Sequence, residues 1–217
     1  MKRITNCLGK FCFACGVLLS ILVMLTILHP RISMQPEGVV ICLLIVTLFM
    51  LLAGMGISKD AERLICFARI RVGIICFLYL VLLYQCVFGN YVFSRDYGID
   101  NYNFIPLKTI TGYFTDFFCD EISGYIVVCN ILGNLLLLAP LGFFLPYFLK
   151  RFRSFGRCFI LWSLCSILIE TVQSLCHIGN FDVDDILLNI MGVSLLYFIM
   201  KNPVIERILV KGKIIIK

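Results

Sequence analysis

Residues 125–146 read YIVVCNILGNLLLLAPLGFFLP, a stretch of 22 residues without a single charge. About 20 apolar helical residues cross the hydrocarbon core of a bilayer, so this stretch is long enough to span it. Similar apolar stretches occur on both sides of it, and we predict six transmembrane helices, at 11–28, 38–57, 72–93, 125–146, 158–178 and 186–200. The predicted fold class is therefore all-α, a polytopic bundle of transmembrane helices.

The overall composition also indicates a membrane protein. Apolar residues make up 61% of the chain, charged residues 15%, and mean hydropathy is +1.00, whereas soluble domains are near ~45–50% apolar and ~25% charged. The net charge of +6 comes from short basic clusters between apolar runs, which favours an anionic membrane surface over nucleic acid as the partner. Most of the twelve cysteines lie inside apolar runs, where a thiol packs as a small hydrophobic group.

The basic residues also predict the orientation, because loops rich in Lys and Arg stay in the cytoplasm. With the N-terminus inside, the cytoplasmic segments 1–10, 58–71, 150–157 and 201–217 hold 16 of the 19 Lys and Arg residues. The outer loops hold only Arg31, Arg95 and Lys108. Both termini are therefore predicted to be cytoplasmic.

Polar residues divide the chain into three parts. Residues 1–93 form a three-helix membrane region almost free of charge within its spans, and residues 201–217 form a basic cytoplasmic tail. Residues 94–200 combine a polar, aromatic outer loop with three spans that carry polar groups. Since ionisable groups inside a membrane are costly and usually functional, we expect the chemistry of the protein in 94–200.

Two of the spans carry polar residues in their outer halves. Glu170 is the only acid buried within a predicted span, and Gln173 follows one turn later on the same helix face. Asn134 lies at a similar depth on the preceding span. Asn residues in membrane helices often only bond a neighbouring helix, so a structural role is as good an explanation for Asn134.

The last span is entered through the sequence DVDDILLNIMG, residues 182–192. Asp182 and Asp185 share a helix face, and Asn189 follows Asp185 at i+4. Asp184 points elsewhere, and its replacement is expected to matter much less than replacement of Glu170. Acids at a helix N-terminus also stabilise the helix dipole without any further function. We expect these groups, Glu170 and Asn134 to converge near the outer surface.

In this order the motifs resemble the VanZ-like family of bacterial membrane proteins, which is associated with teicoplanin resistance. The resemblance covers about residues 95–200: Arg95, Asn103 and Pro106 in the outer loop, then NLLLLAPLGFFLP (134–146), ETVQ (170–173) and DVDDILLNIMG (182–192). Family members often have an Arg just before the Asp motif, and this chain has none between Arg157 and Lys201. The resemblance implies a multi-pass protein of the bacterial cell membrane with a role in the cell envelope.

Three functions are compatible with this pattern. The first is a site that binds or acts on an envelope lipid or lipid-linked component at the outer leaflet, with a role in resistance to glycopeptides of the teicoplanin type. Its candidate catalytic residues are Glu170, Asp182 and Asp185, and its candidate substrate-binding residues are Arg95, Asn103, Asn134, Gln173 and Asn189. The second is a non-catalytic membrane scaffold or binding protein. The third, a small lipid or solute transporter, is disfavoured because the inner halves of the last three spans are apolar.

The sequence leaves open whether the protein is an enzyme. Glu170, Asp182 and Asp185 are suitable as acid, base or cation ligands, but no nucleophile or established catalytic motif accompanies them. Metal, cofactor, substrate and oligomeric state are not predicted.

The predicted topology can be tested by cysteine labelling in a cysteine-free version of the chain. A single cysteine within 96–121 should react with a membrane-impermeant thiol reagent in intact cells. A cysteine within 150–157 should react only after permeabilisation, because the basic loops are expected to face the cytoplasm. The reverse pattern would contradict the orientation.

Overall fold

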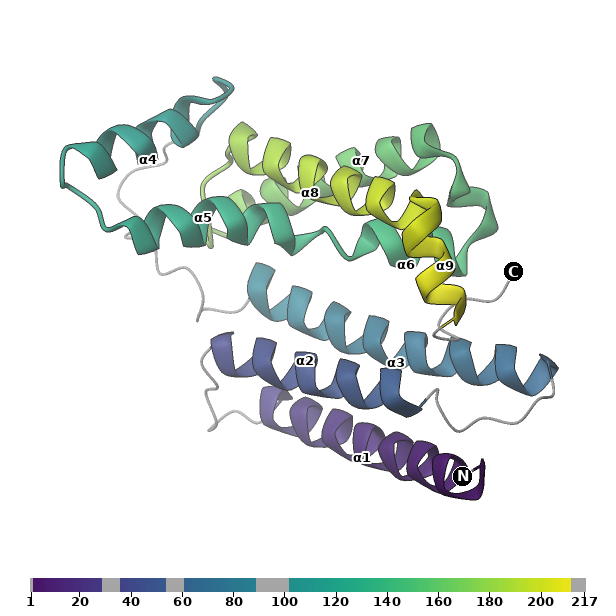
Figure 1. The fold of residues 1–217 in the computed structure, drawn as a ribbon. Helices are drawn as coiled ribbons and strands as arrows, with labels where there is room; N and C mark the ends of the chain where they lie inside the picture. The colour runs from purple at the N-terminus through teal and green to yellow at the C-terminus, as the bar shows by residue number, and fades with distance from the viewer. Residues whose placement is uncertain (1, 29–35, 54–60, 89–101, 212–217) are drawn as a thin grey trace. The chain divides into compact units, whose positions relative to one another are not determined.

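A computed structural model describes residues 2–28, 36–53, 61–88 and 102–211. Within these residues the chain is helical and its one pairing of β type is an isolated bridge. The elements are α1 (Lys2–Leu28), α2 (Pro36–Leu52), α3 (Ala61–Phe88), α4 (Lys108–Phe118), α5 (Gly124–Leu137), α6 (Leu141–Phe148), the 3-10 helix η2 (Lys150–Arg153), α7 (Phe155–Leu175), α8 (Val183–Lys201) and α9 (Pro203–Lys211) (Figure 1).

The predicted all-α, polytopic fold is confirmed. Five helical segments of the described chain are long and apolar enough to cross a membrane, namely Cys7–Leu25, Ile65–Val87, Gly124–Phe148, Phe155–Leu175 and Val183–Lys201. The remaining predicted span, 38–57, overlaps α2, which has 17 residues and ends at Leu52. That length is at the lower end of the range, roughly 17 to 25 residues, for a membrane-crossing helix.

The fourth predicted span is a broken helix. α5 ends at Leu137 and α6 begins at Leu141, and Pro140 lies between them. Proline has no N–H to continue the α-helical bonding, so the chain turns tightly here. The amides of Leu141 and Gly142 donate to the carbonyls of Leu138 and Ala139 at 2.9 and 2.8 Å. α6 follows α5 in roughly the same direction, with this break between them (Figure 1).

The chain separates into two compact units, one comprising residues 1–86 and 202–217 and the other Val87–Lys201. In the first unit, α1 packs along α2. Its core contains Val46 and Met50 of α2 with Leu78 of α3, and Phe13 of α1 lies 4.7 Å, centroid to centroid, from Phe67 of α3. These contacts bury apolar faces of all three helices.

One charge in the first unit lies where the sequence predicted a loop. α3 begins at Ala61, so Arg71 falls within a membrane-crossing helix, where it is only 2% exposed. Its Nη1 donates to the carbonyl of Met50 at 2.8 Å, and its guanidinium lies 5.3 Å from the ring centroid of Phe67. Met50 is in the last turn of α2, where carbonyls lack helical partners. Arg71, predicted to lie in the loop just before the span 72–93, is instead a buried cation of α3 that bonds the end of α2.

The second unit is built around α8, which packs against α5, α6 and α7. Two glycines allow these close contacts. A Cβ added at Gly192 of α8 would lie 1.6 Å from the carbonyl oxygen of Leu135 on α5. A Cβ at Gly142 of α6 would lie 2.5 Å from the carbonyl oxygen of Val193 on α8. Small residues drive helix association in lipid by letting backbones approach in this way.

Replacing Gly192 by Ala should destabilise the second unit by at least about 2 kcal/mol, since the new methyl group would overlap the backbone of α5. Unfolding of the protein in detergent, followed by loss of helical circular dichroism, measures this change. Gly156 of α7 is the matched control, because a Cβ there meets no atom within 4 Å. Its replacement by Ala should leave stability within about 1 kcal/mol. Equal effects of the two substitutions would contradict the packing described here.

Candidate functional site

The N-terminus of α8 is organised by the carboxylate of Asp182. Asp182 Oδ1 accepts a hydrogen bond from the backbone N–H of Asp184 at 2.8 Å, which caps the helix. The same oxygen accepts from Asn103 Nδ2 at 2.9 Å, and Asp182 Oδ2 accepts from Thr109 Oγ1 at 2.6 Å. One buried carboxylate thus joins the start of α8 to two points of the segment 103–109, called the outer segment here because the sequence predicts it outside the membrane.

The backbone strengthens this junction. Asn103 and Asp182 form a parallel β-bridge, in which Asn103 N donates to Phe181 O at 2.9 Å and Val183 N donates to Asn103 O at 3.0 Å. The side chain of Asn103 also donates to Thr109 Oγ1 at 3.0 Å and accepts from the amide of Ile105 at 3.1 Å. Asn103, predicted to bind substrate, therefore uses its side chain to hold the outer segment against α8.

Asp184 holds the N-terminus of α4. Its Oδ2 accepts hydrogen bonds from the amides of Thr109 and Ile110 at 2.7 and 3.1 Å, and its Oδ1 accepts one from the amide of Leu107. These are the orphan N–H groups of the first turn of α4, and a carboxylate there also stabilises the helix dipole. Asp184 is fully buried. The predicted grouping of Asp182 with Asp185 is therefore wrong, since Asp184 and Asp182 both bond Thr109. Asp184 is a central structural group and cannot serve as an inert control.

The two remaining acids face the neighbouring membrane helices. Asp185 Oδ1 accepts a hydrogen bond from Asn134 Nδ2, which links α8 to α5. Glu170 of α7 lies beside the start of α8, where the amide of Asp182 approaches Glu170 Oε2 to 3.4 Å. Both acids are buried, at 8% and 4% exposure. The structure thus brings Asn134, Glu170, Asp182 and Asp185 together around one end of α8.

Three other predicted site residues lie differently. Gln173 donates to the carbonyl of Val87 at 3.1 Å, a bond within the second unit. Asn189 is completely buried, and neither its Oδ1 nor its Nδ2 has a hydrogen-bond partner among the described protein atoms. Arg95 lies outside the described residues.

The arrangement of the acidic side chains determines whether this site could bind a metal ion. Among the residues that the structure describes, no group of three or more His, Cys, Asp or Glu side chains is placed to hold a metal ion. Both oxygens of Asp182 and both of Asp184 already accept hydrogen bonds from protein donors. Glu170 and Asp185 have protein partners as well, the amide of Asp182 and the side chain of Asn134 respectively.

Sequence reasoning missed Thr109, which bonds both Asp182 and Asn103. The only feature of the local sequence that marks Thr109 is its position next to Lys108, at the start of α4. It also missed Trp162 and Ser166 of α7, which carry buried polar atoms. Their signal is spacing, since 162, 166 and 170 follow one another at i+4 and so share a helix face.

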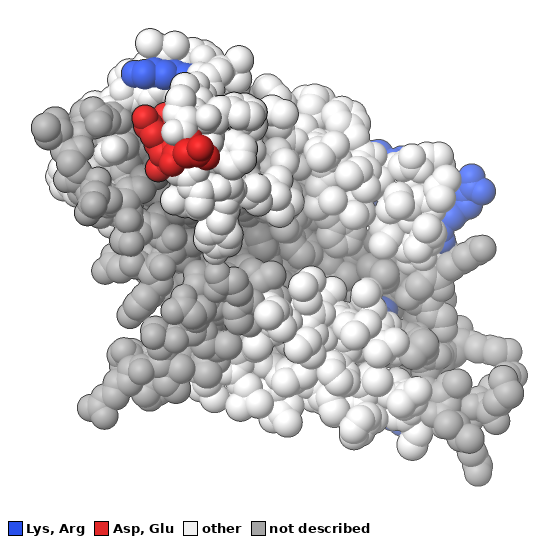
Figure 2. Space-filling model, turned by 60° about the vertical axis from the view of Figure 1, so that its left-hand side comes forward, with Lys and Arg blue, Asp and Glu red and all other residues white. Residues whose placement is uncertain are grey.

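The rim of the site is apolar. Phe104 follows Asn103 and is 67% exposed, and Leu107, whose amide bonds Asp184, is 56% exposed. Phe118, at the end of α4, is 79% exposed. The acids Asp120 and Glu121, just beyond α4, are exposed as well, and Figure 2, turned to bring this side of the molecule forward, shows acidic surface there. The exposed apolar side chains of Phe104 and Leu107 thus lie next to residues that bond the buried carboxylates of Asp182 and Asp184.

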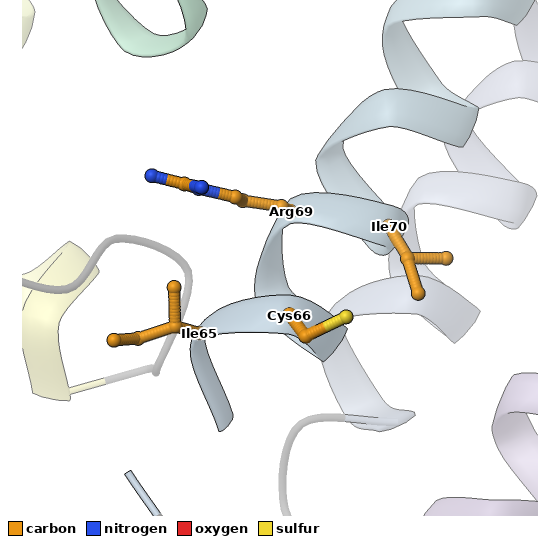
Figure 3. Close-up of a pocket in the computed structure, with 4 residues that line it drawn as sticks. All are labelled: Ile65, Cys66, Arg69 and Ile70. Carbon is orange, nitrogen blue, oxygen red and sulfur yellow. The ribbon is translucent and has the colours of Figure 1, made fainter. Parts of the chain in front are cut away.

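A hollow elsewhere on the protein is unrelated to these residues. It is lined by Ile65, Cys66, Arg69 and Ile70, all from neighbouring turns of α3 in the first unit (Figure 3). Since one helix surface provides the whole lining, with no acid among its residues, the hollow adds nothing to the candidate site.

The fold and the site define a polytopic α-helical membrane protein with buried carboxyl groups at one end of its last three spans. A family model, VanZ/LLP1, matches residues 38–207, and the chain belongs to this family. The match begins in α2, so it extends well beyond residues 95–200, over which the motifs carry the resemblance. No match is found among curated proteins or among solved structures.

Replacing Asp184 by Ala should free the start of α4. Each amide bonded to the carboxylate loses a charge-assisted hydrogen bond, which contributes roughly 1.5 to 3 kcal/mol. Hydrogen–deuterium exchange at Leu107, Thr109 and Ile110 should therefore become at least about tenfold faster.

Glu121→Ala is the control, because this acid is exposed and next to the same helix. It should leave exchange at these three amides unchanged. Unaltered exchange in the Asp184 variant would show that the carboxylate does not hold α4.

Proposed function

We propose that this protein binds an envelope lipid or lipid-linked component at the outer leaflet of the bacterial cell membrane, and that this interaction contributes to resistance to glycopeptides of the teicoplanin type. The observation that carries the proposal is the direct contact between an apolar rim and a polar interior. Phe104 and Leu107 are exposed, and the residues bonded to Asp182 and Asp184 are their immediate neighbours or their own backbone. An amphiphile, with an apolar chain and a polar headgroup, matches such a surface.

The helix α4 supports a lipid partner. It carries exposed aromatic side chains, Phe114, Phe117 and Phe118, and aromatic rings favour the interface between lipid and water. Its start is fixed by Asp184, so the apolar side chains at Leu107 and beyond are held next to the acids. In the predicted orientation, this surface lies at the outer leaflet.

The carboxyl groups indicate what kind of headgroup the site accepts. Carboxylates only accept hydrogen bonds, so they prefer hydroxyl, amide or ammonium donors. Sugar and amino groups of envelope precursors offer such donors. Glu170 and Asp185 are our candidates for contact with the headgroup, while Asp182 and Asn103 position the outer segment. Glu170 can also exchange a proton with a bound group, which leaves catalysis open to test.

Replacing Glu170 by Gln should abolish protection against a teicoplanin-type antibiotic, because the amide keeps the volume of the side chain but removes its titratable proton and its charge. Growth of cells carrying each variant at equal membrane abundance measures protection. Asp185→Asn should weaken protection as well.

Glu121→Gln makes the same chemical change on an exposed side chain and should protect like the unchanged protein. Full protection by the Glu170 variant would reject a chemical or ligand-contacting role for this residue. The scaffold function would then be preferred.

A further inference from the structure

The buried face of α7 carries polar atoms beyond the acidic site. Cys158, Trp162, Ser166 and Glu170 are the buried residues of this helix, and they follow one another at i+4. At 1.5 Å per residue, the stripe extends roughly 12 Å from Glu170 to Trp162 along the helix. Polar atoms of Trp162 and Ser166 therefore lie on the buried face of α7 beyond Glu170.

Three buried polar groups near this stripe have no hydrogen-bond partner among the described protein atoms. They are the indole Nε1 of Trp162, the hydroxyl of Ser166, and both amide atoms of Asn189 on α8. The three side chains are 1%, 0% and 0% exposed.

The hydroxyl of Ser166 is distinctive in this respect. Ser20 and Thr171 each donate to the carbonyl four residues earlier in their own helix, at 2.7 Å. Ser166 makes no such bond. Its hydroxyl is therefore available to a partner on the buried side of α7.

These groups lie between two fixed contacts of α7 with α8. At one end Glu170 meets the amide of Asp182, and at the other the rings of Trp162 and Tyr197 are 5.6 Å apart. Ser166 is midway between Trp162 and Glu170 on the same face of α7. Around α8, at about 100° per residue, Asn189 lies about 40° from Asp185, which faces α5, and about 80° from Tyr197, which faces α7. Asn189 is thus directed into the junction of the three helices.

We propose that Trp162, Ser166 and Asn189 form a hydrated inner site, which binds water at the junction of α5, α7 and α8 and continues the acidic site into the membrane. A polar group buried in lipid without a partner costs several kcal/mol, and three such groups in one junction need a common ligand. Water fits because it both donates and accepts, as it must to serve an indole N–H, a hydroxyl and an amide together. A metal ion does not fit, since the indole N–H can only donate.

Water in the proposed inner site is close enough to the buried carboxyl group of Glu170 to exchange a proton with it. Ser166 is one helical turn from Glu170, so water held by Ser166 is within reach of that carboxyl group. This hydration does not depend on whether the outer surface binds a lipid.

Trp162 reports on the proposed site directly, because it is the only tryptophan of the chain. In the full-length protein in nanodiscs, ultraviolet resonance Raman spectroscopy should show a hydrogen-bonded indole N–H. After transfer to heavy water, this N–H should exchange at least about 100-fold faster than the backbone amides of α7 around it, which exchange only when the helix opens. An indole without a hydrogen bond, or one that exchanges as slowly as those amides, would overturn the proposal.

Variants identify the residues that hold the water. The double substitution Ser166→Ala with Asn189→Leu should remove the hydrogen bond to the indole and slow its exchange, because the polar partners of the water are gone and Leu fills space. Ser163→Ala is the control, on the next residue to Trp162 but on another face of α7. A hydrogen-bonded, fast-exchanging indole in the double variant would place the water elsewhere and overturn the assignment. The measurements on the intact protein test the proposal by themselves, so misfolding of the double variant would not affect that test.

Discussion

The carboxylate of Asp182 is the interaction on which the outer site depends. It caps α8 and also accepts hydrogen bonds from the side chains of Asn103 and Thr109. These bonds connect segments more than 70 residues apart in sequence. Asp184, two residues later, adds the start of α4 to the same assembly. In lipid, where polar groups must find partners inside the protein, such a network fixes the position of every segment that it joins.

The four acids of the site have two different roles. Asp182 and Asp184 are occupied by protein donors, so their function is to position α4 and the segment before it. Asp185 bonds Asn134 of α5, and Glu170 of α7 approaches the amide of Asp182 at the start of α8. Gly192 of α8 and Gly142 of α6 let α8 pack closely against α5 and α6. Rigid helices thus carry the residues proposed to meet a ligand, and an apolar outer helix borders them.

The fold follows from the sequence because hydrophobic length and basic loops act locally. All six predicted spans contain helix in the described chain, and the family resemblance of the acidic motifs is confirmed by the match over 38–207. The candidate acids were found because charge within an apolar run is rare. Spacing grouped Asp182 with Asp185 wrongly, because α8 begins only at Val183; Asp182 and Asp184 both bond Thr109, whereas Asp185 bonds Asn134.

Other features depend on contacts between distant residues and could not be predicted in this way. Arg71 looked like a loop residue because it belongs to a basic cluster, yet it bonds Met50 across two helices. The role of Asp184 depends on α4, about 75 residues earlier in the chain. Helical spacing shows only which way Asp184 points, and it cannot show what that side chain meets. The buried, unpartnered groups of Ser166 and Asn189 become apparent only when helices α5, α7 and α8 are packed together.

The junction between the outer segment and α8 can be tested most directly by a disulfide. In a cysteine-free chain, cysteines at positions 103 and 182 replace residues of a β-bridge, whose Cα atoms are about 5 Å apart, a separation that suits a disulfide. Mild oxidation of intact cells should link them, and a membrane-impermeant reductant added outside should break the link. The control pair, 121 and 182, should not link, because residue 121 lies beyond the far end of α4. No link between 103 and 182, or a link that resists the external reductant, would contradict an outer site organised by Asp182.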